Sequence, residues 1–420
     1  MKKQILVFAI FSSVVVGCTK TETEEETSPS SSITDSSTDE TPATTSAFVP
    51  CEGGKAGAFP CDGYDLYAHI NLDAMLSKSG NDCWGWTDPE TGNEYVLMGL
   101  DNGTGFVDIT TPEAPKYLGK LPTATDSSIW RDIKVYQNHA YIVSEAPGHG
   151  MQVFDLTKLR GVTEAQTFTA DSRNTSFGNA HNIALNEVSG YAYVIGSGLE
   201  NGGPIFFDLS NFKNPTNVGG YRFSGYSHDA QIVNYQGPDD EFSGIELYLG
   251  SHSDGSSYNK LVLLDVSNKE TPRLIAEMSY PSPGYTHQSW ITEDHRYIIL
   301  GDELDESKFG GKTRSVVIDV SDLDNPSLHH TYLGVTNAID HNGYVKDDHF
   351  YLANYTAGFR AITLAELENG KMQEVGFFDT YPANDRTAFD GAWNVYPFFE
   401  SGIIAVSDLN SGLFLIKKKE

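Results

Sequence analysis

The feature that most constrains this fold is a repeat of about fifty residues. A short apolar strand ending in Asp recurs five times, at Asp108, Asp155, Asp208, Asp265 and Asp319. The steps between successive Asp residues are 47, 53, 57 and 54 residues. Self-similarity at a nearly fixed period is typical of architectures in which each repeat is one supersecondary unit. We therefore expect a fold assembled from repeated units.

Each repeat contains enough chain for four short strands. A polar segment opens the repeat, an apolar strand follows, the Asp-ending strand comes third, and a strand such as 117–119 or 332–334 comes last. Seven such units fit between residues 64 and 417, at about 51 residues each, somewhat longer than the ~40–45 residues of compact propeller repeats. This pattern predicts an all-β fold, a seven-bladed β-propeller of four-stranded blades.

The first and last repeats are expected to share a blade. The seventh repeat supplies strands near 391–396, 402–407 and 412–417, which leaves its outer strand missing. The segment 64–72 precedes the first repeat and alternates in the manner of a strand. We predict that this N-terminal strand completes the last blade and closes the ring, which removes exposed sheet edges. A six-bladed ring with a flanking hairpin is the alternative. The propeller would then span residues 64–420.

Residues 1–17 have the pattern of a signal peptide. Lys2 and Lys3 precede an apolar run, 5–16, that is too short to span a bilayer. The run ends Val-Val-Gly before Cys18, which resembles a bacterial lipobox and predicts lipidation of Cys18. The alternative is a plain signal peptide with an incidental Cys. The lipid would be the only contact of the chain with a membrane.

Residues 18–47 combine this Cys with a segment rich in Ser, Thr and Glu. Such a composition buries too little apolar surface to offset the entropy of ordering, so we expect a disordered stalk. The acidic run at 21–26 resembles export signals of surface lipoproteins in Bacteroidota-type bacteria. The expected location is therefore the outer membrane, facing the cell surface, with a periplasm-facing tether as the alternative.

Residues 48–63 form a separate Cys-containing loop. Cys51 and Cys61 flank a Gly-rich stretch, and in an exported protein this spacing predicts a disulfide bond. Cys83 is left over in a strand-like context and is expected to be a buried free thiol, although pairing with Cys61 stays open.

The charge of the chain excludes two classes of function. Lys and Arg number 28 against 57 Asp and Glu, a formal net charge of -29. A nucleic-acid-binding protein needs a basic surface, and so does electrostatic docking on anionic lipid. A closed ring without free edges is expected to be a monomer.

The sequence resembles the choice-of-anchor B family, built from LVIVD-repeat propeller blades. The matching stretches are 84–92, 105–110, 130–136 and 149–155, and the resemblance covers residues about 50–417. It implies an exported propeller attached to the cell surface, and it brings no established reaction.

The polar segments that open the repeats supply the candidate site. In a propeller these positions line one mouth of the central channel. The first aligned column reads Asp82, Arg131, His181, His228, His287, His341 and Asp390. The second reads Asp132, Asn182, Asp229, Gln288 and Asn342.

Four His residues in consecutive blades favour a divalent transition metal, with neighbouring Asp and Asn groups orienting the rings. A four-His site on a seven-bladed propeller is similar, by analogy of fold alone, to that of carotenoid-cleaving oxygenases. The alternatives are a ring of hydrogen bonds that holds the blades together, or a site for an organic ligand.

Two carboxylate patterns have other interpretations. The run 302–306 is acidic enough for Ca²⁺, but its spacing is not that of a calcium loop, so a solvated loop is favoured. The strand-end Asp residues are expected to form turns.

Two functions therefore remain. The first is a tethered binding or scaffold module for a protein or glycan partner. The second is a metal-dependent enzyme, such as an oxidoreductase, that uses the four His residues. The sequence names no catalytic residue and no cofactor beyond these metals.

Overall fold

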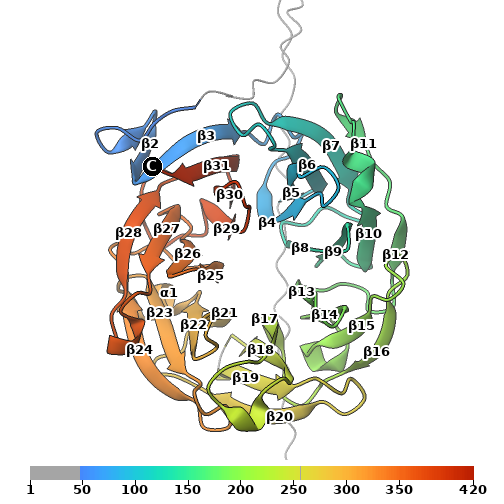
Figure 1. Ribbon diagram of the computed structural model, residues 1–420, viewed down its shortest axis with the longest axis vertical. Coiled ribbons are helices and arrows are strands. Elements are labelled where there is room, and N and C mark those ends of the chain that lie inside the picture. Colours follow the sequence, from blue (N-terminus) through green and yellow to red (C-terminus); the bar gives the residue numbers. More distant parts are fainter. Residues whose placement is uncertain (1–47, 256) are drawn as a thin grey trace, which may run out of the picture. The chain divides into compact units, whose positions relative to one another are not determined.

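The computed structural model describes residues 48–420 with the exception of residue 256. Within this part of the chain, seven antiparallel four-stranded blades form a ring (Figure 1). The prediction of a seven-bladed β-propeller is confirmed. The predicted signal peptide, Cys18 and the stalk lie outside the described residues.

The first four blades follow in chain order, each running from its innermost to its outermost strand. They are β4 (Gly80–Thr87), β5 (Glu94–Leu100), β6 (Gly103–Asp108) and β7 (Lys116–Pro122) in blade 1; β8 (Arg131–Tyr136), β9 (His139–Ser144), β10 (Met151–Asp155) and β12 (Ser172–Asn174) in blade 2; β13 (Asn182–Asn186), β14 (Tyr191–Ile195), β15 (Ile205–Asp208) and β16 (Thr216–Gly220) in blade 3; and β17 (Ser227–Asn234), β18 (Glu246–Ser253), β19 (Asn259–Asp265) and β20 (Arg273–Met278) in blade 4.

The remaining blades complete the ring. They are β21 (Thr286–Ile291), β22 (Tyr297–Asp302), β23 (Arg314–Asp319) and β24 (Ser327–Leu333) in blade 5; β25 (Gly343–Lys346), β26 (His349–Ala353), β27 (Phe359–Thr363) and β28 (Gln373–Phe378) in blade 6; and β29 (Ala392–Tyr396), β30 (Ile403–Asp408), β31 (Gly412–Lys418) and β3 (Tyr64–Ile70) in blade 7. A five-residue helix, α1 (Asp305–Phe309), lies between β22 and β23.

The ring closes as predicted, by a strand from the start of the propeller in the last blade. β3 pairs antiparallel with β31, with Ala68 opposite Leu415 and Ile70 opposite Leu413. These four side chains are fully buried in one apolar cluster that also contains residues of blade 1. The seam between the two ends of the propeller is therefore packed like any other part of the core.

The recurring strand-end Asp residues are turn formers, as expected. In each of the five repeats, one carboxylate oxygen accepts a hydrogen bond from the backbone N–H two residues later, at 2.7–3.1 Å. This local bond turns the chain out of the third strand. The repetition of Asp thus follows from the repetition of one turn.

Short strands extend two of the blades. β1 (Lys55–Ala56) and β2 (Phe59–Asp62) form a hairpin whose second strand pairs with β28, and β11 (Gln166–Thr167) pairs with β7. A disulfide bond joins Cys51 to Cys61 in that hairpin, and Cys83 is a buried thiol. The segment 48–63 therefore covers the outer edge of blade 6, where an exposed strand would invite pairing.

Within residues 48–420, none of the helices is both long enough and apolar enough to cross a bilayer.

The closing seam makes a first prediction. Leu415→Ala removes a fully buried side chain between β31 and β3 and should lower the free energy of unfolding by about 2–5 kcal/mol. Leu333→Ala, on the outer strand of blade 5, is the matched control, because Leu333 is 61% exposed. Thermal and urea unfolding measure both. Equal effects of the two substitutions would contradict the packing described for the seam.

Candidate metal centre

Four imidazole rings form a continuous row at one end of the innermost strands. His181, His228, His287 and His341 come from blades 3 to 6, at or just before the start of those strands. Successive ring centroids are 4.0, 4.3 and 4.2 Å apart, and neighbouring rings are tilted by 43–47°. We call these residues the His row and the cavity above them the His mouth.

Backbone contacts set the tautomer of two rings in the row. The Nδ1–H of His228 donates to the carbonyl oxygen of His287 at 3.1 Å, and that of His341 donates to the carbonyl of Trp393 at 2.5 Å. Because a carbonyl oxygen only accepts, the proton lies on Nδ1 in both rings. The Nε2 lone pair is then free, which is the arrangement found in metal-ligating His residues.

Glu303 completes a group of three potential metal ligands. Its carboxylate oxygens lie 3.8 Å from Nε2 of His287 and 3.6 Å from Nε2 of His341. Ligand atoms of the three residues all lie within 4.8 Å of one another. Two nitrogen or oxygen atoms bound at 2.0–2.1 Å to one ion are at most about 4.2 Å apart, so only a small contraction is needed.

The other two members of the His row lie outside this group. Among the described residues, the one His-containing cluster with metal-ligand spacing includes His287 and His341 but neither His181 nor His228. His181 instead pairs with Glu145, whose Oε1 lies 2.7 Å from Nδ1. The structure thus does not bring the four His residues of the sequence hypothesis to one point. They follow the curve of the ring, and each imidazole packs against its neighbours in the row.

Burial controls the protonation of the site. It lowers the pKa of His228 and His287 well below the ordinary value, with the neighbouring imidazoles adding to the effect, and it lowers the pKa of His341 to about 3. These rings are therefore neutral at pH 7, as metal binding requires. Burial also raises the pKa of Glu303 to about 7. Burial lowers the pKa of His181, but the hydrogen bond with Glu145 and the negative charges of nearby carboxylates together outweigh it, so the pKa is raised.

One observation distinguishes the centre from an ordinary packed core. Tyr355 donates its hydroxyl proton to Oε1 of Glu303 at 3.0 Å, and its backbone has φ of +32°, which is rare for a bulky residue. Strained residues of this kind cluster at functional sites.

The His mouth is an open cavity with an apolar rim. Its volume is about 350 Å³. It is lined by the His row together with Ile129, Trp130, Glu303, Tyr355, Phe389, Trp393 and Leu409. Ile129, Trp130 and Phe389 are exposed although they are large and apolar. A small molecule with an apolar body would fit this rim, with a polar end toward the His row.

Below the His row, the second predicted column holds neighbouring blades together. Asp82 accepts the backbone N–H of Ile133 at 2.9 Å, Asp132 that of Ile183 at 2.7 Å, and Gln288 that of Gly343 at 2.6 Å. Asn182 donates a hydrogen bond to Asp229 at 3.0 Å. These residues and Asn342 surround a narrow space that we call the neck. For this column, the structure fits the alternative of hydrogen bonds that hold the blades together.

Two members of the first column, Asp82 and Asp390, lie elsewhere than the alignment predicts. Asp82 belongs to the second column, as its bond to the next blade shows. Arg131 lines the same space as the His row, with Nη1 3.0 Å from Nε2 of the buried His149. Asp390 lies on the loop before β29, where Asn410 donates to it at 3.1 Å. Trp393 lies next to His341, in the position predicted for Asp390. The polar segment of the last repeat is therefore shifted by three residues relative to the other repeats.

Sequence reasoning misses Glu303 as a ligand, because it predicts a solvated loop at 302–306. That prediction is wrong, since Asp302, Asp305 and Glu306 are buried. A signal was present in the repeat. Glu145 and Glu303 each follow directly after the second strand of a blade, and each contacts a member of the His row in the next blade.

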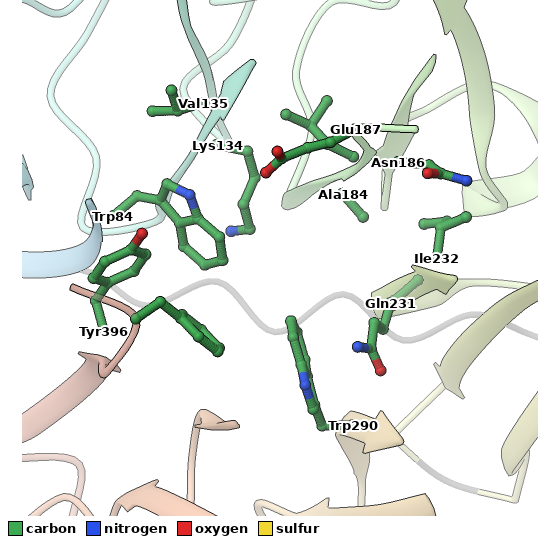
Figure 2. A pocket seen from close by; sticks show the side chains of 13 residues that line it. Trp84, Lys134, Val135, Ala184, Asn186, Glu187, Gln231, Ile232, Trp290 and Tyr396 are labelled. Carbon is green, nitrogen blue, oxygen red and sulfur yellow. The ribbon is translucent and has the colours of Figure 1, made fainter. Parts of the chain in front are cut away.

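The opposite ends of the innermost strands form a second hollow, of about 420 Å³ (Figure 2). Trp84, Trp290 and Tyr396 converge on it from three blades, and Phe398 completes its aromatic lining. Nζ of Lys134 lies 4.4 Å from the Trp84 ring centroid and 2.8 Å from Asp132. We call this hollow the aromatic mouth.

The comparisons with known proteins support the fold alone. No family model matches the chain, and no curated protein matches it. Among solved structures it is similar to a protein from Lactobacillus plantarum, with a TM-score of 0.52 and 14% identity over 80% of this chain and 91% of the other. It is also similar to hydrazine synthase from Kuenenia stuttgartiensis, with a TM-score of 0.51 and 11% identity over 76% and 91%.

The buried Asp229 in the neck leads to a prediction about the pH dependence of stability. Burial, with Asp132 adding to it and Lys134 opposing it, raises the pKa of Asp229 to about 7, against about 4 in an unfolded chain. Between these values the folded protein keeps a proton that the unfolded chain has lost, so the contribution of Asp229 to stability falls as pH rises. Asp229→Asn removes this loss. The melting temperature of the variant should therefore gain on that of the wild type from pH 5 to pH 8.

Asp240→Asn, at an exposed position, controls for general effects of charge. A difference between Asp229→Asn and wild type that does not change with pH would contradict the assignment.

Proposed function

We propose that this chain is an exported β-propeller that binds a divalent transition metal at its His mouth and presents it to a small molecule in the cavity. The observation that carries the proposal is the convergence of His287, His341 and Glu303 at the base of an open cavity. Two imidazoles and one carboxylate leave coordination positions free, which is typical of catalytic rather than structural metal sites.

The residues around the centre have distinct roles in this proposal. His287 and His341 bind through Nε2, and the carbonyl of Trp393 keeps the His341 ring in the correct tautomer. Tyr355 orients the Glu303 carboxylate. The metal supplies Lewis acidity to an oxygen or nitrogen atom of the bound molecule. Ile129, Trp130 and Phe389 favour a molecule with an apolar body.

The location of the protein is a proposal from its sequence. The lipobox-like residues before Cys18 and the acidic stalk support attachment to the outer membrane, facing the cell surface, through the N-terminal lipid alone. The stretches that resemble the choice-of-anchor B family support membership of that family. The closed ring supports a monomer.

Zn²⁺ titration calorimetry at pH 7.5 tests the metal centre. Zn²⁺ is a sensitive probe because it binds nitrogen and oxygen sites more tightly than Mn²⁺ or Fe²⁺ does. The wild type should bind one equivalent, and Glu303→Gln and His341→Ala should each weaken binding about tenfold or more.

His181→Ala is the matched control, since it removes a ring of the same row that lies outside the ligand group. It should bind Zn²⁺ with nearly the wild-type affinity. An equal loss in His181→Ala, or no binding by the wild type, would contradict the proposed centre.

A second candidate function is glycan binding at the aromatic mouth, in keeping with a tethered binding module. Trp84, Trp290, Tyr396 and Phe398 offer flat apolar faces around one hollow, and Lys134 and Glu187 add polar groups (Figure 2). Aromatic faces beside a few polar groups suit the apolar faces and hydroxyls of sugars.

An array of immobilised oligosaccharides tests this candidate. Trp290→Ala should weaken the binding of any retained sugar about tenfold or more, because the substitution removes an indole face on which the sugar would stack. Trp130→Ala, at the His mouth, should leave sugar binding intact. Retention of no sugar by the wild type, or equal losses in the two variants, would eliminate the glycan hypothesis.

A further inference from the structure

A second cluster of potential ligands lies beside the metal centre, and all of its side chains are carboxylates. Asp305 and Glu306 come from the short helix α1, and Asp340 directly precedes His341. They are 5%, 4% and 1% exposed, respectively. One oxygen atom from each lies within 4.8 Å of the other two.

Several oxygens of this cluster lack a partner in the protein. Neither carboxylate oxygen of Asp340 makes a hydrogen bond of ordinary geometry, and the same holds for Oδ1 of Asp305 and Oε2 of Glu306. A buried carboxylate without partners is costly, and several together are more so. Since one oxygen of each residue lies within 4.8 Å of the other two, a single ligand there would contact all three carboxylates.

The charges around the cluster are unbalanced. Asp302, also buried, accepts hydrogen bonds from Gly284 N–H, Tyr285 N–H and the Tyr280 hydroxyl, so its oxygens are already occupied. Arg314 pairs with the cluster, with Nε bonded to Asp305 and Nη2 3.6 Å from Asp302. Fully ionised, the four carboxylates would outnumber the guanidinium by three charges. Burial and the neighbouring carboxylates raise the pKa of Asp305 and Asp340, and raise that of Glu306 to about 11, so without a cation the cluster holds protons.

We propose that Asp305, Glu306 and Asp340 bind a Ca²⁺ ion. Calcium takes six to eight oxygen ligands at 2.3–2.6 Å in flexible geometry, and three carboxylates supply up to six. Mg²⁺ demands strict octahedral geometry and retains several waters, which suits a closed cluster less well. A bound Ca²⁺ ion would displace the protons of the cluster and balance two of the three excess negative charges of its ionised form. Gly301 leaves room for the Asp340 carboxylate, because any side chain there would meet its Oδ2.

The ion would connect two segments that carry the metal centre. Asp305 and Glu306 follow Glu303 within three residues, and Asp340 is the neighbour of His341. Ca²⁺ would therefore fix the loop of blade 5 against the start of blade 6. Only this positioning role rests on the proposed transition-metal centre, since binding of Ca²⁺ itself does not depend on it.

The test uses the purified full chain after removal of metals with EDTA and dialysis. Calorimetry should show one Ca²⁺ bound, and 1 mM Ca²⁺ should raise the melting temperature by several degrees. Asp340→Asn should lose at least about tenfold in Ca²⁺ affinity, together with the thermal shift. Asp408→Asn is the matched control, because Asp408 is an equally buried carboxylate in blade 7.

His287→Ala separates the two metal sites. It removes a ligand of the transition-metal centre and should leave the thermal shift with Ca²⁺ unchanged, whatever becomes of Zn²⁺ binding. Terbium luminescence serves if Asp340→Asn does not fold, because Tyr280, bonded to Asp302, lies close enough to sensitise Tb³⁺. Wild-type luminescence should then fall as Ca²⁺ displaces Tb³⁺.

The proposal is overturned if Ca²⁺ changes neither the melting temperature nor the Tb³⁺ signal, or if Mg²⁺ alone has an effect. It is also overturned if Asp340→Asn melts higher than the wild type without added metal and the wild type does not respond to Ca²⁺. That result would mean the carboxylates are satisfied by protons.

Discussion

The pairing of β3 with β31 is the constraint on which the rest of this propeller depends. It joins the two ends of the propeller domain in one blade, so each of the seven sheets packs between two others. Closure directs all seven innermost strands toward one axis (Figure 1). Side chains at equivalent positions of successive blades are then forced together, however far apart they lie in sequence. His181 and His341 belong to one row for this reason.

The same geometry determines the protonation state of the His row. Rings about 4 Å apart exclude water from one another, so burial keeps His228, His287 and His341 neutral and ready to accept a metal. A row that follows the ring cannot by itself surround one ion, and the carboxylate after the second strand decides where a ligand group forms. Glu145 pairs with His181, whereas Glu303 forms a group of three potential ligands with His287 and His341. One repeated scaffold thereby supports an ion pair in one blade and a candidate metal centre in another.

The sequence predicted the repeated features well and the unrepeated ones poorly. Blade number, ring closure and the Asp turns follow from residues that recur at a fixed spacing, and each is confirmed. Asp390 was misplaced because the last repeat departs from the common pattern and puts Trp393 beside His341. The local sequence after β22 predicts a solvated loop, because only tertiary contacts, such as the ion pair of Asp305 with Arg314, remove this acidic segment from water. Ligands such as Glu303 come from segments of this kind, where local sequence carries little information.

Anomalous diffraction from crystals of the Co²⁺-loaded protein tests the assignment of the metal centre most directly. Data collected on both sides of the cobalt absorption edge locate the ion independently of any assay. We predict one strong peak at the His mouth, about 2.0–2.2 Å from Nε2 of His287, Nε2 of His341 and a carboxylate oxygen of Glu303. A peak bound by His181 and His228, or no cobalt peak within the His mouth, would contradict it.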